Sequence, residues 1–287
     1  MAEPEEPVSE TLTFDFDNAT EMARLIEQDR RSNEAMGGPL TGLPVFPSGA
    51  QVIDLACGPG GWALDAAYER PDIEVAGVDT SRIMIEYANA RARTQKRTNA
   101  SFGIMDITQP LDFADASFDL VNARALQGVL RRDAWVPFIA ECLRVLKPGG
   151  ILRLTEGLDF GLTTSPAVER MLAALSQMFW KLGFGFSVDG RSFGVIPPLP
   201  AFLREAGYQD VHIAAFMIEF SAGMPAWIDF YHNYEIAFQR VKPVFASIGA
   251  MTEEAFDQDY HQVFIDMNLP TFRGVQTFAS IIGTKPA

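Results

Sequence analysis

The stretch VIDLACGPGGWALD, residues 52–65, decides the fold. It begins as a short apolar run that holds one acid, Asp54, and continues into a turn with Gly58, Gly60 and Gly61. A helical pattern follows, and this order is typical of a buried parallel strand that turns into a helix. Because glycine has no Cβ, such a turn lets a ligand come close to the backbone. We therefore expect a nucleotide-like ligand at this turn.

Strands and helices alternate along most of the chain. Segments with the length and composition of strands recur, and helical patterns separate most of them. The seven predicted strands lie at residues 50–56, 73–79, 100–106, 117–123, 151–156, 210–220 and 276–285. This alternation predicts an α/β, Rossmann-like fold with a seven-stranded, mostly parallel sheet and helices on both faces.

The alternation breaks twice, and each break predicts an insertion. The second break is rich in aromatic residues, and an insertion of that length often has its own helices and a binding role. The predicted division is an N-terminal helical cap and linker (1–48), the ligand-binding core (49–157), a helical and loop lid (158–197), a continuation of the core (198–220), an aromatic-rich helical cover for the substrate (221–271) and the final core strand (272–287).

Composition excludes several classes of function. The 287 residues carry a net charge of −14, which repels phosphate backbones, so we expect no nucleic-acid partner. The two cysteines, Cys57 and Cys142, form no disulfide framework or metal-binding pattern, so no metal is expected. No apolar run is long enough to span a membrane, and a cytoplasmic protein is the expectation.

Three successive predicted strands end in an acid, namely Asp54, Asp79 and Asp106. In an open parallel sheet, ligands bind beyond the carboxyl ends of the strands, so these carboxylates should share one rim. Asp79 lies about 20 residues beyond the glycines, which suits a ribose diol. Asp106 can accept a hydrogen bond from an exocyclic adenine amine.

Four motifs together resemble those of class I S-adenosylmethionine-dependent methyltransferases, most closely the ubiquinone/menaquinone-biosynthesis type and related small-molecule enzymes. The resemblance covers roughly residues 50–157, and the flanking segments are far less diagnostic. The motifs read VIDLACGPGGWALD, VAGVDTSRIMIEYA, IMDITQPLDFADASFDLVNAR and ECLRVLKPGGILRLTEG.

The resemblance implies S-adenosyl-L-methionine as cofactor, S-adenosyl-L-homocysteine as product, and a role for each motif residue. The residues implied to surround the methionine moiety and the sulfonium are Asp54, Ala56, Gly58, Gly60, Asn122 and Ala123. The residues implied to hold ribose and adenine are Asp79, Thr80, Met84, Met105, Asp106 and Ile107. Family members often hold the methionine carboxylate from an N-terminal helix, for which Gln28, Arg30 and Arg31 stay open as candidates.

Two other functions are compatible with parts of the pattern. The first is a non-methylating S-adenosylmethionine binder, either cyclase-like or regulatory, which would keep the same acids and glycines. The second is a nicotinamide dehydrogenase, because GPGGWA fits G-x-G-x-x-A. Trp62 would crowd a pyrophosphate at the helix start, and Asp106 would have no role in that site.

Methyl transfer to a small-molecule acceptor demands no single catalytic side chain, because the methyl group is already activated. A base is needed only when the acceptor carries a proton of high pKa. The candidate catalytic residues are His232, Glu156 and Arg124, each with a structural alternative. The candidate acceptor-pocket residues, which alternatively pack the inserted helices, are Gln127, Phe179, Trp180, Phe186, Phe193, Trp227, Tyr231 and Tyr234. The aromatic residues favour an apolar or aromatic acceptor, and a homodimer is one option for the assembly.

Overall fold

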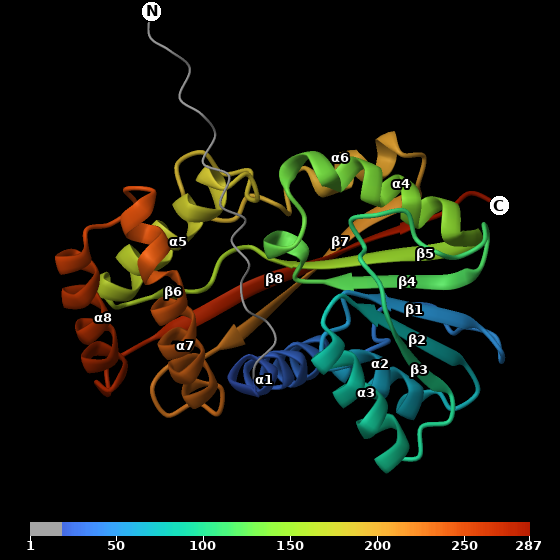
Figure 1. The fold of residues 1–287 in the computed structure, drawn as a ribbon, viewed down its shortest axis with the longest axis horizontal. Helices are drawn as coiled ribbons and strands as arrows, with labels where there is room; N and C mark the ends of the chain where they lie inside the picture. The colour runs from blue at the N-terminus through green and yellow to red at the C-terminus, as the bar shows by residue number, and fades with distance from the viewer. Residues whose placement is uncertain (1–18) are drawn as a thin grey trace, which may run out of the picture.

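A twisted sheet runs through the computed structural model, which describes residues 19–287 (Figure 1). Its strand order is β3-β2-β1-β4-β5-β8-β6, and β7 pairs with the other edge of β8. The strands are β1 (Gln51–Leu55), β2 (Glu74–Asp79), β3 (Ala100–Ile104), β4 (Phe118–Arg124), β5 (Leu146–Gly157), β6 (Leu162–Thr163), β7 (Gln209–Glu219) and β8 (Gly274–Thr284).

The predicted mostly parallel sheet is confirmed. Strands β1 to β5 are mutually parallel, and β8 runs antiparallel to both β5 and β7. The seven longer strands correspond to the seven that the sequence predicts, and the eighth strand, β6, has only two residues. Because β1 and β4 are neighbours while their connections leave in opposite directions, the topological switch point of the sheet lies between them.

Side chains alternate along the central strands, so each strand contributes to two apolar layers. Ile53 and Val121 belong to the larger core, which also contains Trp135 of α4. Val52 and Leu120, one residue earlier on each strand, pack instead with Trp62 of α2. The helices are α1 (Ala19–Met36), α2 (Gly61–Glu69), α3 (Arg82–Thr94), α4 (Trp135–Val145), α5 (Pro166–Lys181), α6 (Leu199–Glu205), α7 (Trp227–Ser247) and α8 (Glu253–Met267).

The two predicted insertions form one helical group beyond the carboxyl end of β5. Helices α5, α7 and α8 pack on one another there, and α1 lies between this group and α2 (Figure 1). Ser165 caps α5 by accepting a hydrogen bond from Val168 N, and Pro166 occupies the first turn, where no N–H donor is needed. No helix within residues 19–287 has the length and apolarity needed to cross a membrane.

Candidate functional site

The turn after β1 contains three residues in the left-handed backbone region. Their φ angles are 56° at Ala56, 51° at Gly58 and 75° at Gly60. A Cβ at Gly60 would lie 2.7 Å from the Phe102 ring and 2.9 Å from Ala88, so packing against β3 and α3 requires a glycine there. A Cβ at Gly58 would meet only Leu25, at 3.7 Å. Gly58 is therefore the position where the missing side chain leaves room for a ligand.

Asp79 joins the end of β2 to this turn. Its Oδ2 accepts a hydrogen bond from Gly58 N at 2.9 Å, and its Oδ1 accepts one from Ser81 N at 2.9 Å. A carboxylate offers about four acceptor positions, so a group oriented in this way suits a pair of ribose hydroxyls. Thr80, next along the chain, is exposed.

The end of β3 lies directly beside Asp79, because Met105 N donates to the Asp79 carbonyl at 3.0 Å. Met105 is half-buried and Asp106 is exposed, and Asp106 Oδ1 accepts hydrogen bonds from Thr108 N at 2.9 Å and Thr108 Oγ1 at 2.7 Å. Met84 and Ile107 are buried beneath this edge. The structure thus brings the predicted ribose and adenine residues together at one rim.

Asn122 and Ala123 lie deeper than the sequence suggested. Both are fully buried, because β4 continues one residue further and ends at Arg124. Asn122 Nδ2 donates to Asp54 Oδ1 at 2.6 Å, while Ala123 packs in the core on the opposite face. Arg124 and Ala125 therefore form the rim at the end of β4, in place of the predicted pair.

Glu156 has a different environment from that of a catalytic base. It is 1% exposed, and its two carboxylate oxygens accept hydrogen bonds from Leu126 N at 2.9 Å and Gln127 N at 3.1 Å. These bonds hold the turn after β4, where Ala125 has a φ of 56°. Burial raises the pKa of Glu156 to about 8, against the opposing effect of the two N–H donors. Its geometry is that of a buried support for the turn.

Helix α1 covers the glycine turn with one face. Leu25, Asp29 and Asn33 recur every four residues, so they share that face. Asp29 accepts a hydrogen bond from Gly61 N, and burial raises the pKa of its carboxyl. Arg124 donates to Asp29 Oδ1 and, at 3.0 Å, to Asn33 Oδ1. The four sequence motifs gave no indication of Asp29. Its spacing of four residues from Leu25 and from Asn33 was the available sign that it lies on the face of α1 that covers the turn.

The predicted carboxylate-binding candidates on α1 face other groups. Gln28 accepts a hydrogen bond from Arg24, and Arg30 and Arg31 form ion pairs with Asp229 of α7 at 2.7 and 3.5 Å. The structure therefore does not bring Gln28, Arg30 or Arg31 to the glycine turn. Arg124 is better placed, because its Nε is buried and has no hydrogen-bond partner among the described residues.

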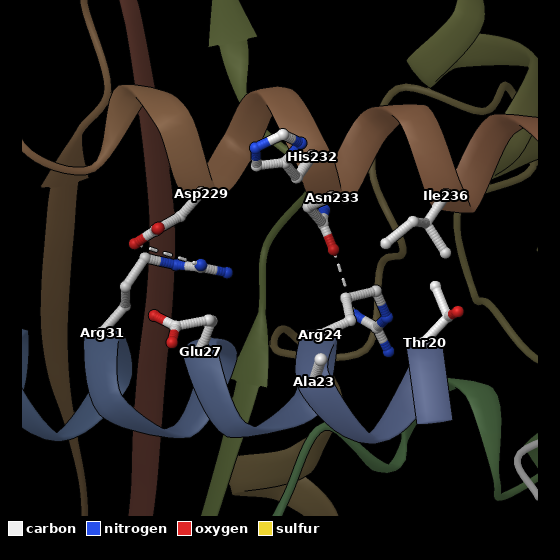
Figure 2. Close-up of a pocket in the computed structure, with 9 residues that line it drawn as sticks. All are labelled: Thr20, Ala23, Arg24, Glu27, Arg31, Asp229, His232, Asn233 and Ile236. Carbon is white, nitrogen blue, oxygen red and sulfur yellow. Dashed lines mark hydrogen bonds and ion pairs between the residues drawn. The ribbon is translucent and has the colours of Figure 1, made fainter. Parts of the chain in front are cut away.

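A cavity of about 490 Å³ lies between α1 and α7 (Figure 2). His232 lines it, together with Thr20, Ala23, Arg24, Glu27, Arg31, Asp229, Asn233 and Ile236. The imidazole is 59% exposed, and its Nδ1 lies 3.4 Å from Glu235 Oε2. Neither the glycine turn nor Arg124 contributes to this cavity wall. His232 is therefore the only predicted catalytic residue among the described residues that line this cavity.

Three of the predicted acceptor-pocket residues adjoin one another at the ends of β4 and β5. The rings of Phe179 and Phe193 are 5.3 Å apart. A Cβ at Gly157 would lie 3.6 Å from Phe193 and 3.7 Å from Gln127 Nε2. The Oε1 atom of Gln127 is buried and has no partner among residues 19–287. This corner combines an apolar wall with an unused polar group.

The remaining aromatic candidates pack the insertions, which was the structural alternative for each of them. Trp180 lies beneath the guanidinium of Arg132 at 4.0 Å, and the Phe186 ring is 5.9 Å from Phe202. Each of the other three makes at least one such contact: Trp227 Nε1 donates to the Met267 carbonyl at 2.9 Å, the Tyr231 ring is 4.8 Å from Phe264, and Tyr234 Oη donates to the Phe160 carbonyl at 2.8 Å.

Comparison with known proteins places this chain in a family. Residues 52–150 match the family model described as "Methyltransferase domain". The demethylmenaquinone methyltransferase of Lactococcus lactis is 30% identical over 143 residues, which cover 49% of this chain and 53% of the relative. The chain therefore spans about half the length of that relative.

Two further proteins extend the comparison. The ubiquinone/menaquinone biosynthesis C-methyltransferase UbiE of Desulfotalea psychrophila is 30% identical over 191 residues, covering 60% of this chain and 71% of the relative. Haemonchus contortus phosphoethanolamine N-methyltransferase 2, solved with S-adenosyl-L-methionine, superposes with a TM-score of 0.55 at 19% identity. That superposition covers 95% of this chain and 59% of the solved chain, and at this identity it shows a shared fold.

Proposed function

The chain belongs to the class I S-adenosylmethionine-dependent methyltransferases, and we propose that it transfers a methyl group to a small apolar or aromatic acceptor. The attacking atom of the acceptor is a carbon, oxygen or nitrogen. The observation that carries the proposal is the bond between Asp79 Oδ2 and Gly58 N. It links the acid at the end of β2 to the glycine turn after β1, across the rim where a nucleoside is expected.

The residues at this rim fit S-adenosylmethionine. Asp79 suits the ribose diol, and Gly58 leaves the space that a Cβ would take. The buried Nε of Arg124, which lacks a partner among the described residues, suits the methionine carboxylate. Asp54, beneath the turn, suits the methionine ammonium group. Each end of the cofactor thus meets a side chain of complementary charge or hydrogen-bonding capacity.

When bound, S-adenosylmethionine would supply a methyl group that is already activated for transfer to the attacking atom of the acceptor. The chain's contribution is alignment of the two partners in line and exclusion of water. Helix α1 covers the glycine turn through Leu25 and Asp29, and the α5 side supplies Phe179 and Phe193. Glu156 supports this arrangement by holding the turn after β4.

The acceptor is proposed to lie against Gln127, Phe179 and Phe193. The two rings favour an apolar or aromatic body, and Gln127 Oε1 suits a hydroxyl or N–H donor on it. Two relatives carry names that refer to menaquinone or ubiquinone biosynthesis. A hydroxylated aromatic ring is accordingly the first acceptor to try. A homodimer and a cytoplasmic location belong to the same proposal, and both rest on the sequence alone.

Two measurements test this function. Isothermal titration calorimetry with S-adenosylhomocysteine should show binding to the wild type and weaker binding to Asp79→Ala, with the exposed Asp112→Ala as a matched control. Incubation with methyl-labelled S-adenosylmethionine and a panel of phenols, indoles and hydroxyquinones should then give a labelled product. Failure to bind either form of the cofactor would overturn the proposal. Binding without any methylated product would favour the non-methylating binder.

A further inference from the structure

Three polar side chains form one buried row across the centre of the sheet. In the strand register, Asp54 of β1 is opposite Asn122 of β4, and Asn122 is opposite Arg153 of β5. Neighbouring residues in register point to the same face of a sheet, so the three side chains lie side by side. Their exposed fractions are 2%, 0% and 0%. The row therefore connects the cofactor rim with the interior of the molecule.

Hydrogen bonds run along the row in one direction. Arg153 Nε donates to Asn122 Oδ1 at 2.8 Å, and Asn122 Nδ2 donates to Asp54 Oδ1 at 2.6 Å. An arginine side chain has donors only and a carboxylate has acceptors only. The Asn122 amide must therefore turn its oxygen to Arg153 and its NH₂ group to Asp54. Arg153 thus determines how Asn122 is presented to the carboxylate.

Arg153 occupies a costly position for a charged side chain. Its neighbours along β5, Leu152 and Leu154, are fully buried, and its guanidinium lies 5.3 Å from the Trp62 ring. Nη2 donates to the Pro39 carbonyl at 2.6 Å, whereas Nη1 has no partner among the described residues. Burying the guanidinium with its Nη1 donor unsatisfied costs free energy, and an apolar side chain could fill the same space without that cost. The charge is therefore better explained by the acid at the other end of the row.

We propose that Arg153 is a positioning residue that acts through Asn122 to keep Asp54 ionised and oriented toward the ammonium group of bound S-adenosylmethionine. This inference rests on the proposed function, because it assigns Asp54 to the methionine end of the cofactor. The proposed function already gives roles to the residues that contact the cofactor. The inference adds a role for Arg153, which does not contact it.

The charges around Asp54 support this role. The titratable and charged groups that face it are Arg124 at the end of β4, Asp29 of α1, Arg153 of β5 and Cys57 of its own turn. Burial raises the pKa of Asp54 to about 7, while Arg124, the Asn122 hydrogen bond and Arg153 oppose that rise. Asp29 adds to it as a like charge. Loss of Arg153 should therefore raise the pKa of Asp54 further.

The test is the pH dependence of S-adenosylhomocysteine binding, measured by calorimetry between about pH 5.5 and 9 so that both midpoints lie inside the range. Wild-type affinity should fall below about pH 7, where Asp54 becomes protonated. In Arg153→Met, the midpoint should move up, by at most about one unit, because Arg153 has the smallest of the three effects that lower the pKa of Asp54. A shift of one full unit would make affinity at pH 6 about tenfold weaker than wild type, with less than a threefold difference at pH 8, and a smaller shift would scale the loss at pH 6 down accordingly.

Three variants keep the test decisive. Trp62 Nε1 also donates to the Pro39 carbonyl, at 2.9 Å. Trp62→Phe removes that hydrogen bond and leaves the row intact, so its midpoint should equal that of the wild type. Asp54→Asn should abolish the pH dependence. Arg153→Lys keeps the charge and serves if the methionine variant does not fold, and its midpoint should stay close to that of the wild type.

An Arg153→Met protein with a lowered melting temperature and an unchanged midpoint would overturn the inference, since a purely structural role predicts that result. If the midpoint of Arg153→Lys shifts as far as that of Arg153→Met, the inference is also overturned. If the wild type binds no S-adenosylhomocysteine at any pH, the proposed function itself fails, so the two failures are distinguishable.

Discussion

Replacing Glu156 by glutamine should invert the order of stability of the two proteins as the pH rises. Glu156 is buried, and its folded-state pKa is about 8, against an ordinary value of 4.5. A raised folded-state pKa means that the stability contributed at low pH is lost as the pH rises toward the folded pKa. This rise in pKa corresponds to about 5 kcal/mol, of which about 2 kcal/mol is lost by pH 6 and about 3 kcal/mol by pH 7.

Glutamine has no such titration, but it places an NH₂ group where one carboxylate oxygen accepts Leu126 N or Gln127 N. The lost bond and the donor left unsatisfied cost about 1–3 kcal/mol at every pH. The Glu156→Gln protein should therefore be less stable than wild type at pH 5, equal near pH 6 and more stable at pH 8. Groups that titrate identically in both proteins cancel in the comparison.

Urea unfolding of both proteins at pH 5, 6, 7 and 8 measures this crossing. Two unfolding free energies that stay parallel across the range would refute the reasoning, since they would show that the pKa of Glu156 is the same in the folded and unfolded states. Turnover at pH 7 provides a second comparison. Cofactor binding with complete loss of methyl transfer in the glutamine variant would restore the catalytic-base interpretation that the buried geometry contradicts.

Three further outcomes follow from the site. Asp79→Ala should weaken S-adenosylhomocysteine binding about 10- to 150-fold, equivalent to about 1.5–3 kcal/mol for charge-assisted hydrogen bonds, and unchanged affinity by calorimetry would refute the ribose assignment. Ala56→Gly should raise the free energy of unfolding by about 0.5–1 kcal/mol, because relief of the left-handed φ exceeds the entropic cost of glycine, and a decrease would show that the methyl group packs usefully. His232→Ala should change the unfolding free energy by less than about 0.5 kcal/mol and leave kcat unchanged, whereas a tenfold drop in kcat would make His232 catalytic.

The fold and the nucleoside side of the site were predictable because both depend on local patterns. Apolar runs with acids at their ends predict parallel strands, and parallel strands place those ends on one rim. Asp79 and Met105 accordingly lie on adjacent strand ends, joined by a backbone hydrogen bond. The six-residue β2 and its neighbours differ from the predicted ranges by only one or two residues at their ends.

The methionine side was harder to predict because it depends on burial and on long-range packing. Asn122 and Ala123 were expected at the rim, and both lie beneath it because β4 extends to Arg124. Asp29 lies on a helix far from the motifs in sequence, and only its four-residue spacing from Leu25 marked the face it shares. Arg153 was not among the predicted site residues, and its burial is unusual because a charged residue in a strand usually faces water.

The Pro39 carbonyl limits where this chain can be divided for protein engineering. It accepts hydrogen bonds from Trp62 Nε1 at 2.9 Å and Arg153 Nη2 at 2.6 Å, so two buried donors share one acceptor from the segment before β1. A fragment that begins after residue 48 would keep both donors and lose that acceptor, at about 1–3 kcal/mol for each orphaned group. A minimal or grafted version of the fold must therefore retain this loop as part of its interior.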